Sequence, residues 1–327
     1  MIKGKQLQYE LWRECNNHCT YCTLGDDIKC TEERLKLKSM EVAISELKKL
    51  KKNEYSVIGL IGGEFFQGQL KPISVYNKFF ELIEVINDLL NKEIIDEFWL
   101  NATMTIGDQK DLYDTINRID NKQKLWILTS YDTIGRFHTK KMFDTWEANI
   151  FRIHNEYPDI KLNVTSILTG DFITKYLSGE FNITEFQNKY KCGLFIKSPV
   201  FPHQYKIEGK KKSKPFVNDN IGYFFPKRRD VLKFFMKYKQ IEGETAYINL
   251  LSNDLRADEI RKNYNNDDQR NLHFIRSRNN IDEYVITDSG TIKRGSIGCI
   301  KGHQDIYCCY LDSDECILCD KESIGKL

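Results

Sequence analysis

The sequence predicts an α/β fold in which short strands alternate with amphipathic helices around a parallel sheet. Within the first 202 residues, short apolar runs alternate six times with stretches whose apolar residues recur at helical spacing. Strands that alternate with helices are joined by right-handed crossovers, which makes the strands parallel. Six such units, fewer than the eight of a closed barrel, predict a (β/α)6 partial TIM barrel.

The predicted elements follow one another at regular intervals. Strands are expected at residues 8–14, 55–61, 95–103, 125–130, 160–168 and 194–200, where the runs are short and apolar. Helices are expected at residues 40–50, 75–91, 112–119, 142–153 and 173–190, where apolar residues lie three or four positions apart. This order predicts that the first strand leads directly into a group of cysteines.

Composition indicates a soluble globular protein. The chain has 327 residues, of which 41% are hydrophobic and 29% charged, and its net charge is +2. A charge this small argues against a strongly nucleic-acid-binding body. No stretch approaches a membrane span, and the N-terminus has no apolar run of signal-peptide length. We therefore expect a cytoplasmic protein with no membrane partner, whose cysteines stay reduced.

The chain divides into three predicted regions. Residues 1–202 form the partial-barrel core. Residues 203–283 form an extension with a basic loop and a helix at 227–240, whose expected apolar side is Val231, Leu232, Phe235 and Tyr238. Residues 284–327 begin with a predicted hairpin at 284–292, whose turn is at 288–290, and continue as a cysteine-rich tail.

The ten cysteines are concentrated near the two ends of the chain, which in a reducing compartment favours metal binding over disulfides. Cys15, Cys19 and Cys22 form a CxxxCxxC motif at the end of the first predicted strand. Three thiolates from one loop suit an iron–sulfur cubane with one iron left open, whereas a closed zinc site needs a fourth ligand. We interpret Cys30 and Cys192 as small buried hydrophobic residues.

The segment Cys15-Asn-Asn-His-Cys19-Thr-Tyr-Cys22 resembles the CxxxCxΦC motif of the radical S-adenosylmethionine superfamily, where Φ is aromatic. Tyr21 stands at the aromatic position, which in the family lies against the cofactor adenine. The resemblance implies a [4Fe–4S] cluster whose open iron binds the methionine end of S-adenosylmethionine. It further implies that one electron cleaves this cofactor to a 5′-deoxyadenosyl radical, which abstracts hydrogen from a substrate.

A second motif, Gly62-Gly63-Glu64, follows the second predicted strand and resembles the family's GGE motif. The resemblance implies that its backbone and acidic side chain hold the amino group of the cofactor. Glycine allows the backbone to approach a ligand closely. The family often continues with proline, where this chain has Phe65.

Weaker resemblances involve other strand ends. Ser130 and Arg136 follow the fourth predicted strand and resemble an SxD…R arrangement whose serine and arginine reach the cofactor carboxylate. A turn serine and a surface arginine would explain the same residues. Polar side chains also end the third and fifth predicted strands, where this architecture places its active site, and these are Asn101, Thr103, Thr165 and Ser166.

Five cysteines lie near the end of the chain, and they are Cys299, Cys308, Cys309, Cys316 and Cys319. Their placement resembles the SPASM and twitch domains that carry auxiliary iron–sulfur clusters in some family members. Because the spacing departs from the usual SPASM pattern, we expect a single second metal site, which is either an auxiliary cluster or a structural zinc. The alternative is that these cysteines bind no metal.

The sequence therefore predicts a radical S-adenosylmethionine enzyme, an oxidoreductase or transferase, that acts on a peptide or small metabolite. The resemblance also implies a reducing partner such as flavodoxin or ferredoxin. Basic residues near aromatics at 206–215 and 227–240 could instead bind a nucleotide or nucleic-acid substrate, although a solvated loop and an amphipathic helix explain them better. Two further alternatives are a glycyl-radical activase and a non-enzymatic, cysteine-rich zinc protein that binds a partner.

Overall fold

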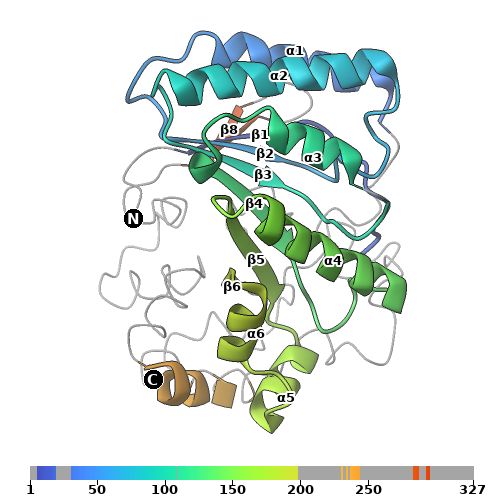
Figure 1. Ribbon diagram of the computed structural model, residues 1–327, viewed down its shortest axis with the longest axis vertical. Helices are drawn as coiled ribbons and strands as arrows, with labels where there is room; N and C mark the ends of the chain where they lie inside the picture. Colours follow the sequence, from blue (N-terminus) through green and yellow to red (C-terminus); the bar gives the residue numbers. More distant parts are fainter. Residues whose placement is uncertain are drawn as a thin grey trace, which may run out of the picture.

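The computed structural model describes residues 6–19, 31–107, 109–197, 230, 233–234 and 236–243, together with the backbone of 283–286 and 292–294. In this part of the chain six strands form an all-parallel sheet in the order β6-β5-β4-β3-β2-β1, which confirms the predicted α/β class. The strands are β1 (Gln6–Glu10), β2 (Val57–Ile61), β3 (Glu97–Asn101), β4 (Leu125–Ser130), β5 (Lys161–Ile167) and β6 (Gly193–Lys197). Because these six strands are parallel, their carboxyl ends meet at one edge, and the arrangement is compatible with a partial barrel (Figure 1).

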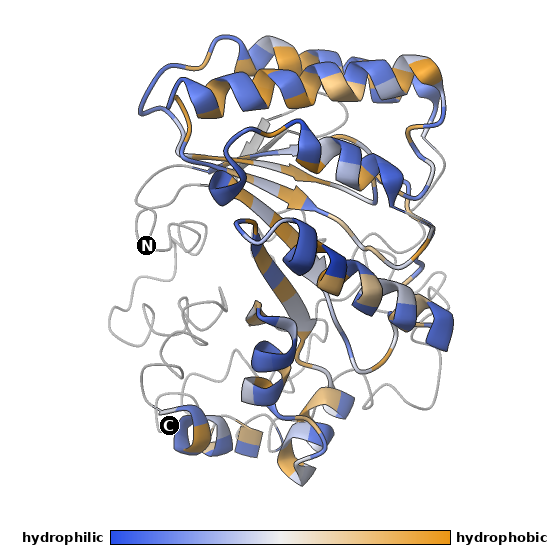
Figure 2. Ribbon diagram, viewed as in Figure 1, coloured by the Kyte–Doolittle hydropathy of each residue, from blue (hydrophilic) through white to orange (hydrophobic). Residues whose placement is uncertain are grey.

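Helices connect the strands in sequence. They are α1 (Glu33–Leu47), α2 (Ile73–Asn91), α3 (Lys110–Asn117), α4 (Lys140–Glu156), α5 (Gly170–Ser178) and α6 (Ile183–Tyr190), with a short 3-10 turn η2 (Lys122–Lys124) before β4. Figure 1 shows α1 and α2 beside the β1–β2 end of the sheet and α5 and α6 near β6. In Figure 2, apolar and polar residues alternate along α1 and α2, as amphipathic helices require. Among the helices of the described residues, none has the length and apolar character needed to span a bilayer.

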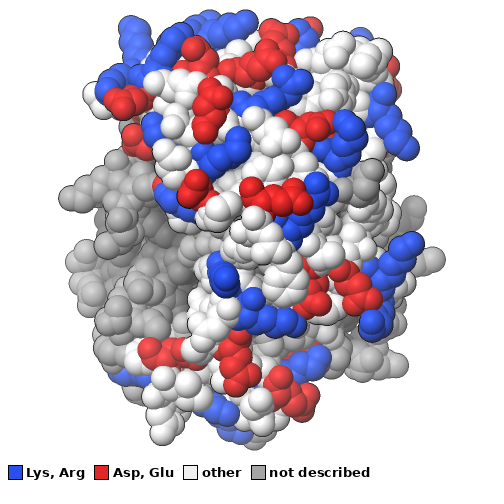
Figure 3. All heavy atoms as spheres, in the orientation of Figure 1, with Lys and Arg blue, Asp and Glu red and all other residues white. Residues whose placement is uncertain are grey.

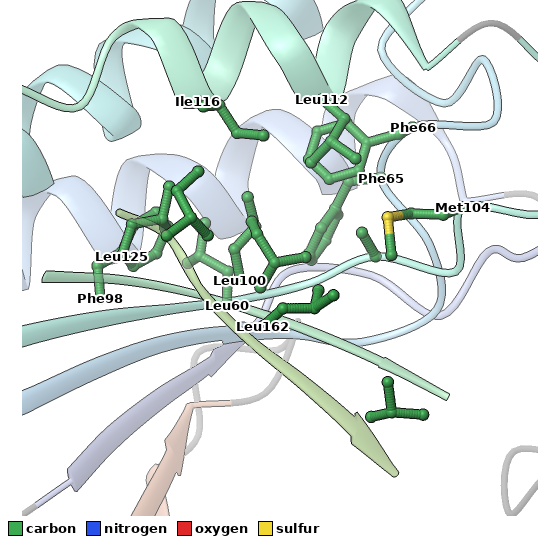
Figure 4. Close-up of a cluster of buried hydrophobic side chains, with 14 of the residues drawn as sticks. Leu60, Phe65, Phe66, Phe98, Leu100, Met104, Leu112, Ile116, Leu125 and Leu162 are labelled. Carbon is green, nitrogen blue, oxygen red and sulfur yellow. The ribbon is translucent and has the colours of Figure 1, made fainter. Parts of the chain in front are cut away.

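The core lies between the sheet and the helices, and Figure 4 shows one part of it. Phe98 and Leu100 of β3 are buried in this cluster, and Leu112 and Ile116 of α3 close it. Trp99, which lies between them on β3, faces the opposite side of the sheet, because side chains alternate along a strand. This packing fixes the strands whose ends carry the candidate site.

The predicted helix at 173–190 is in fact two helices, α5 and α6. Gly179 ends α5 in a left-handed conformation, with φ of 87°, which glycine adopts without strain. Asn182 then caps α6, and its side-chain oxygen accepts a hydrogen bond from the backbone N–H of Glu185 at 3.1 Å. The end of one helix at Gly179 and the start of the next at Asn182 lie three residues apart, within what reads as one apolar pattern.

Two other boundaries differ from the prediction near the cysteines. Helix α1 begins at Glu33, seven residues before the predicted start. The prediction missed its first turns because Lys36 occupies a buried position that an apolar pattern does not reveal. Its ammonium group lies 2.6 Å from Glu14 Oε2 and donates to the carbonyl of Gln69 at 3.1 Å. Strand β1 ends at Glu10 rather than residue 14, although single backbone hydrogen bonds to the end of β2 continue beyond it.

The extension and the hairpin are described only in part. Residues 236–243 are helical, and Phe234 and Tyr238 are buried against Tyr176 of α5, with ring centroids 5.0 and 6.2 Å away. Tyr238 was expected on the apolar side of this helix, but Phe234 was not. Strands β7 (Glu283–Ile286) and β8 (Ile292–Arg294) pair antiparallel, as the predicted hairpin requires. β7 pairs parallel with β1, so β8 is the outer strand of the sheet on this side.

Charges of both signs are mixed over the helical face shown in Figure 3. Several form ion pairs one helical turn apart, such as Lys140 with Asp144 at 3.0 Å and Arg152 with Glu156 at 2.9 Å. Exposed pairs of this kind contribute at most about 1 kcal/mol each. The mixture agrees with the small net charge of the whole sequence.

Candidate metal and cofactor site

A pocket of about 270 Å³ lies at the carboxyl ends of the parallel strands. Parallel α/β sheets generally bind their ligands at this edge. The pocket is lined by most of the described residues that the sequence motifs singled out, and these are Cys15, Cys19, Gly62, Gly63, Glu64, Asn101, Thr103, Ser130, Arg136 and Thr165. Segments separated by up to 150 residues in the sequence therefore converge on one cavity.

Several predicted site residues lie outside the described part of the chain. Near the first motif these are Tyr21 and Cys22. In the tail they are Cys299, Cys308, Cys309, Cys316 and Cys319. Among the described residues no group of three or more metal-binding side chains gathers, and the third predicted ligand of the first motif, Cys22, is not among them.

The two described cysteines of the motif are linked through Asn17. Its backbone N–H donates to Cys15 Sγ at 3.4 Å, and its side-chain Nδ2 donates to Cys19 Sγ at 3.1 Å. Asn17 is only 1% exposed, and its Oδ1 accepts a hydrogen bond from the hydroxyl of Thr105. Asn17 was not predicted as a site residue, because nothing in the motif distinguishes it from Asn16.

The loop after β4 contacts the cysteine loop at two points. Arg136 is 7% exposed, and its Nη1 lies 3.6 Å from Cys19 Sγ. The Nε2 atom of His138 lies 2.8 Å from the carbonyl oxygen of Asn17 and 3.1 Å from that of His18. His18 has a φ of 46°, in the left-handed region that disfavours side chains, so the contact holds a strained turn. His138 was not predicted, since a lone histidine 120 residues away carries no sequence signal.

The two glycines of the GGE segment allow a close approach, but to the chain after β1. A Cβ atom on Gly62 would lie 2.2 Å from the Trp12 carbonyl oxygen, and one on Gly63 would lie 2.1 Å from that of Glu14. Backbone hydrogen bonds join the same segments, from Gly63 N to Trp12 O and from Glu64 N to Glu14 O, both at 2.8 Å. The glycines thus bring the cysteine loop and the GGE segment to the same wall of the pocket.

Glu64 is 1% exposed and forms three hydrogen bonds with backbone groups. Its Oε1 accepts from the N–H groups of Phe65 at 2.9 Å and Phe66 at 3.0 Å, and its Oε2 accepts from Thr103 N–H at 2.5 Å. A carboxylate has about four acceptor positions, so one remains for a ligand. Glu64 therefore joins the ends of β2 and β3 besides lining the pocket.

Phe65, where the family often has proline, is a core residue. It is buried beside Trp12, with ring centroids 5.0 Å apart and nearly perpendicular planes. The indole Nε1 of Trp12 in turn donates to the carbonyl of Glu64 at 2.8 Å. Edge-to-face aromatic pairs of this kind contribute about 0.5–1.5 kcal/mol beyond the area they bury.

The remaining polar strand ends separate into two groups. Ser130, Asn101, Thr103 and Thr165 line the pocket. Ser166 is fully buried outside the pocket lining, and its hydroxyl has no hydrogen-bond partner among the described residues. The alternation along β5 explains the difference, because neighbouring residues of a strand face opposite sides.

Cys192 differs from the motif cysteines. It packs against the hydrophobic core, and burial raises the pKa of its thiol to about 12. This environment agrees with its interpretation as a small hydrophobic residue. Cys30, interpreted in the same way, lies outside the described residues.

The donor set at the pocket fits an iron–sulfur group and a polar cofactor. Cys15 and Cys19 line the pocket, and N–H donors are directed at their sulfurs, as donors beside metal-ligating thiolates commonly are. The guanidinium of Arg136 places positive charge beside one sulfur, and hydroxyl and amide groups line the rest of the wall. No protein-family model matches the chain, and no curated protein matches its sequence.

Proposed function

We propose that this chain is a radical S-adenosylmethionine enzyme built on a (β/α)6 partial barrel, in which Cys15, Cys19 and Cys22 hold a [4Fe–4S] cluster. The observation that carries the proposal is that Cys15 and Cys19 share one pocket with the Gly62-Gly63-Glu64 segment. The two motifs jointly resemble those of the superfamily, and the fold brings them to one pocket. When bound, the cluster and S-adenosylmethionine supply an electron that cleaves a C–S bond and a 5′-deoxyadenosyl radical that removes hydrogen from a substrate.

In this proposal, the chain's own residues bind and orient the cofactor. The Gly62–Gly63 backbone and the remaining acceptor position of Glu64 suit the amino group of the cofactor. Ser130 and Arg136, which line the same pocket, suit its carboxylate, because hydroxyl and guanidinium groups donate hydrogen bonds to such anions. Arg136 thus has two roles in the proposal, one toward the Cys19 sulfur and one toward the cofactor. Tyr21 is proposed to lie against the adenine.

The proposed substrate, electron donor and second metal site rest on the sequence motifs. The enzyme, an oxidoreductase or transferase of the cytoplasm, would act on a peptide or small metabolite and receive its electron from flavodoxin or ferredoxin. The cysteines of the tail would hold a second metal, either zinc or an auxiliary iron–sulfur cluster. Metal analysis of a chain lacking the first cluster through Cys15→Ala, Cys19→Ala and Cys22→Ala should then still find about one zinc or about four irons.

The proposed function is tested by anaerobic reconstitution of the purified chain with iron and sulfide. We expect a brown protein that, once reduced, releases 5′-deoxyadenosine from S-adenosylmethionine. Screening that release against peptides, metabolites, nucleotides and nucleic acids identifies the substrate class. A glycyl-radical activase would instead respond to a partner enzyme. If the reconstituted protein holds zinc but no iron, the proposal fails, and the alternative of a non-enzymatic zinc protein that binds a partner takes its place.

A further inference from the structure

Asn17 occupies a position between the two described cysteine sulfurs. Its backbone N–H is directed at Cys15 Sγ at 3.4 Å and its side-chain amide at Cys19 Sγ at 3.1 Å. The same residue therefore donates to both sulfurs, once from the main chain and once from the side chain. Its 1% exposure keeps water from taking over either contact.

A network from two other loops fixes the orientation of this amide. The Thr105 hydroxyl donates to Asn17 Oδ1, which leaves the NH2 group facing Cys19. Thr105 Oγ1 lies 3.4 Å from Thr103 Oγ1, and the latter accepts from Gln67 Nε2 at 2.9 Å. Gln67 Oε1 also accepts from Asn16 N–H at 2.9 Å, so the network returns to the cysteine loop.

Burial of the loop alone does not require this arrangement. A buried asparagine is satisfied by any backbone carbonyl and N–H, and the exposed amide of Asn16 binds such a group, the carbonyl of Gln67 at 3.4 Å. Asn17 instead directs its donor at a sulfur while a threonine hydroxyl holds its oxygen away. Donors directed at cysteine sulfurs are one of the means by which proteins set the reduction potential of iron–sulfur groups.

We propose that Asn17 is a positioning residue that raises the reduction potential of the group bound by Cys15 and Cys19. This inference rests on the proposed function. Reduction adds negative charge that the thiolates share, and an N–H donor stabilises the more negative state more strongly. The Asn17 side chain thereby favours acceptance of an electron from the reducing partner. The potential falls when the donor is replaced by an acceptor.

The test compares Asn17→Asp with Asn16→Asp in the full-length reconstituted protein. Asp has the shape of Asn but puts a carboxylate oxygen where the amide faced Cys19. We expect reduction of the Asn17→Asp cluster to be about tenfold less favourable, equivalent to about 59 mV for a one-electron couple. Asn16→Asp places the same charge one residue away and should leave the potential near the wild-type value. Thr105→Val removes only the hydroxyl that holds the Asn17 amide oxygen. It should lower the reduction potential as Asn17→Asp does, but by a smaller amount.

Midpoint potentials from redox titration followed by electron paramagnetic resonance give the readout, with iron content and thermal unfolding of the iron-free chains measured in parallel. Equal potentials for Asn17→Asp and Asn16→Asp overturn the inference alone. A wild-type chain that takes up no iron overturns the proposed function, and the inference with it. If Asn17→Asp loses iron while its iron-free chain unfolds like wild type, Thr105→Val decides the question: a potential lower than that of the wild type supports the inference, and an equal potential overturns it. If that chain also unfolds at a lower temperature than Asn16→Asp, the role of Asn17 is structural and the inference fails.

Discussion

Glu64 lies in the pocket wall and also joins two strand ends, so its replacement should affect folding as well as binding. In Glu64→Ala, the N–H groups of Phe65, Phe66 and Thr103 lose their common acceptor. Glu64→Gln keeps one oxygen and turns an NH2 group toward one of these donors. The two variants therefore remove different numbers of hydrogen bonds from the same position.

The expected size follows from these contacts. A buried donor left without a partner costs about 1–3 kcal/mol. Water from the pocket can reach part of the site, so we expect Glu64→Ala to lower the free energy of unfolding by about 3–5 kcal/mol. Glu64→Gln should cost about 1–3 kcal/mol, because one donor loses its acceptor. A domain is usually stable by only about 5–15 kcal/mol, so the alanine variant is close to the limit of folding.

The assay is urea unfolding of the iron-free chains, followed by circular dichroism and tryptophan fluorescence. The matched control is Glu84→Gln, which removes an exposed carboxylate paired with Arg118 at 2.9 Å and should cost less than about 1 kcal/mol. If Glu64→Ala unfolds within 0.5 kcal/mol of this control (roughly the size of ordinary surface effects), the hydrogen-bond network does not hold the strands together.

The same variants separate folding from binding. Glu64→Gln should still fold and hold the cluster, but it loses the charge that we propose binds the cofactor amino group. Loss of one charge-assisted hydrogen bond costs about 1.5–3 kcal/mol, or roughly ten- to hundredfold in affinity. A titration that finds unchanged affinity for S-adenosylmethionine would remove Glu64 from the binding site and leave it a structural role.

Three further predictions follow from described contacts. Gly63→Ala should lower stability by several kcal/mol, roughly as overpacking of a core does, because its Cβ would lie 2.1 Å from the Glu14 carbonyl oxygen; an unchanged urea midpoint would contradict this. His138→Ala should speed hydrogen exchange in residues 15–19 without changing the global unfolding midpoint by more than about 1 kcal/mol, and protection equal to wild type would show that the histidine does not hold the loop. The pKa of the Glu147 carboxyl is lowered by its hydrogen bond from Lys189. The pair therefore contributes stability that is present above the ordinary carboxyl pKa and is lost as the pH falls through the lowered pKa of the folded state. Because both groups are partly exposed, Glu147→Gln should remove at most about 1 kcal/mol of that acid-dependent stability, and a difference that persists unchanged at low pH would argue against the pair.

Much of the sheet could be predicted because its signal is local. Leu7 and Tyr9 of β1 are buried against the helices, and the strands after β2 repeat the same short apolar runs. The two cysteines were also predictable, since their spacing lies within five residues. The break between α5 and α6 was missed because apolar residues continue on both sides of Gly179.

The supporting contacts of the site could not be predicted from sequence patterns. Asn17 and Thr105 are 88 residues apart, and His138 lies 121 residues from Asn17, so only the folded chain shows that they meet. Lys36 was missed for a different reason, because a buried ion pair replaces the apolar residue that a helical pattern requires. Motifs thus identify residues that carry chemistry, while the residues that orient them depend on tertiary structure.

The most direct test of the central claim compares the wild-type chain with the Cys15→Ala, Cys19→Ala and Cys22→Ala triple variant after anaerobic reconstitution. Cys192→Ala is the matched control, since that cysteine packs against the core away from the pocket lining. The proposal predicts that the triple variant holds about four fewer irons per chain and releases no 5′-deoxyadenosine from S-adenosylmethionine, while the control behaves as wild type. A triple variant that still cleaves S-adenosylmethionine would contradict it.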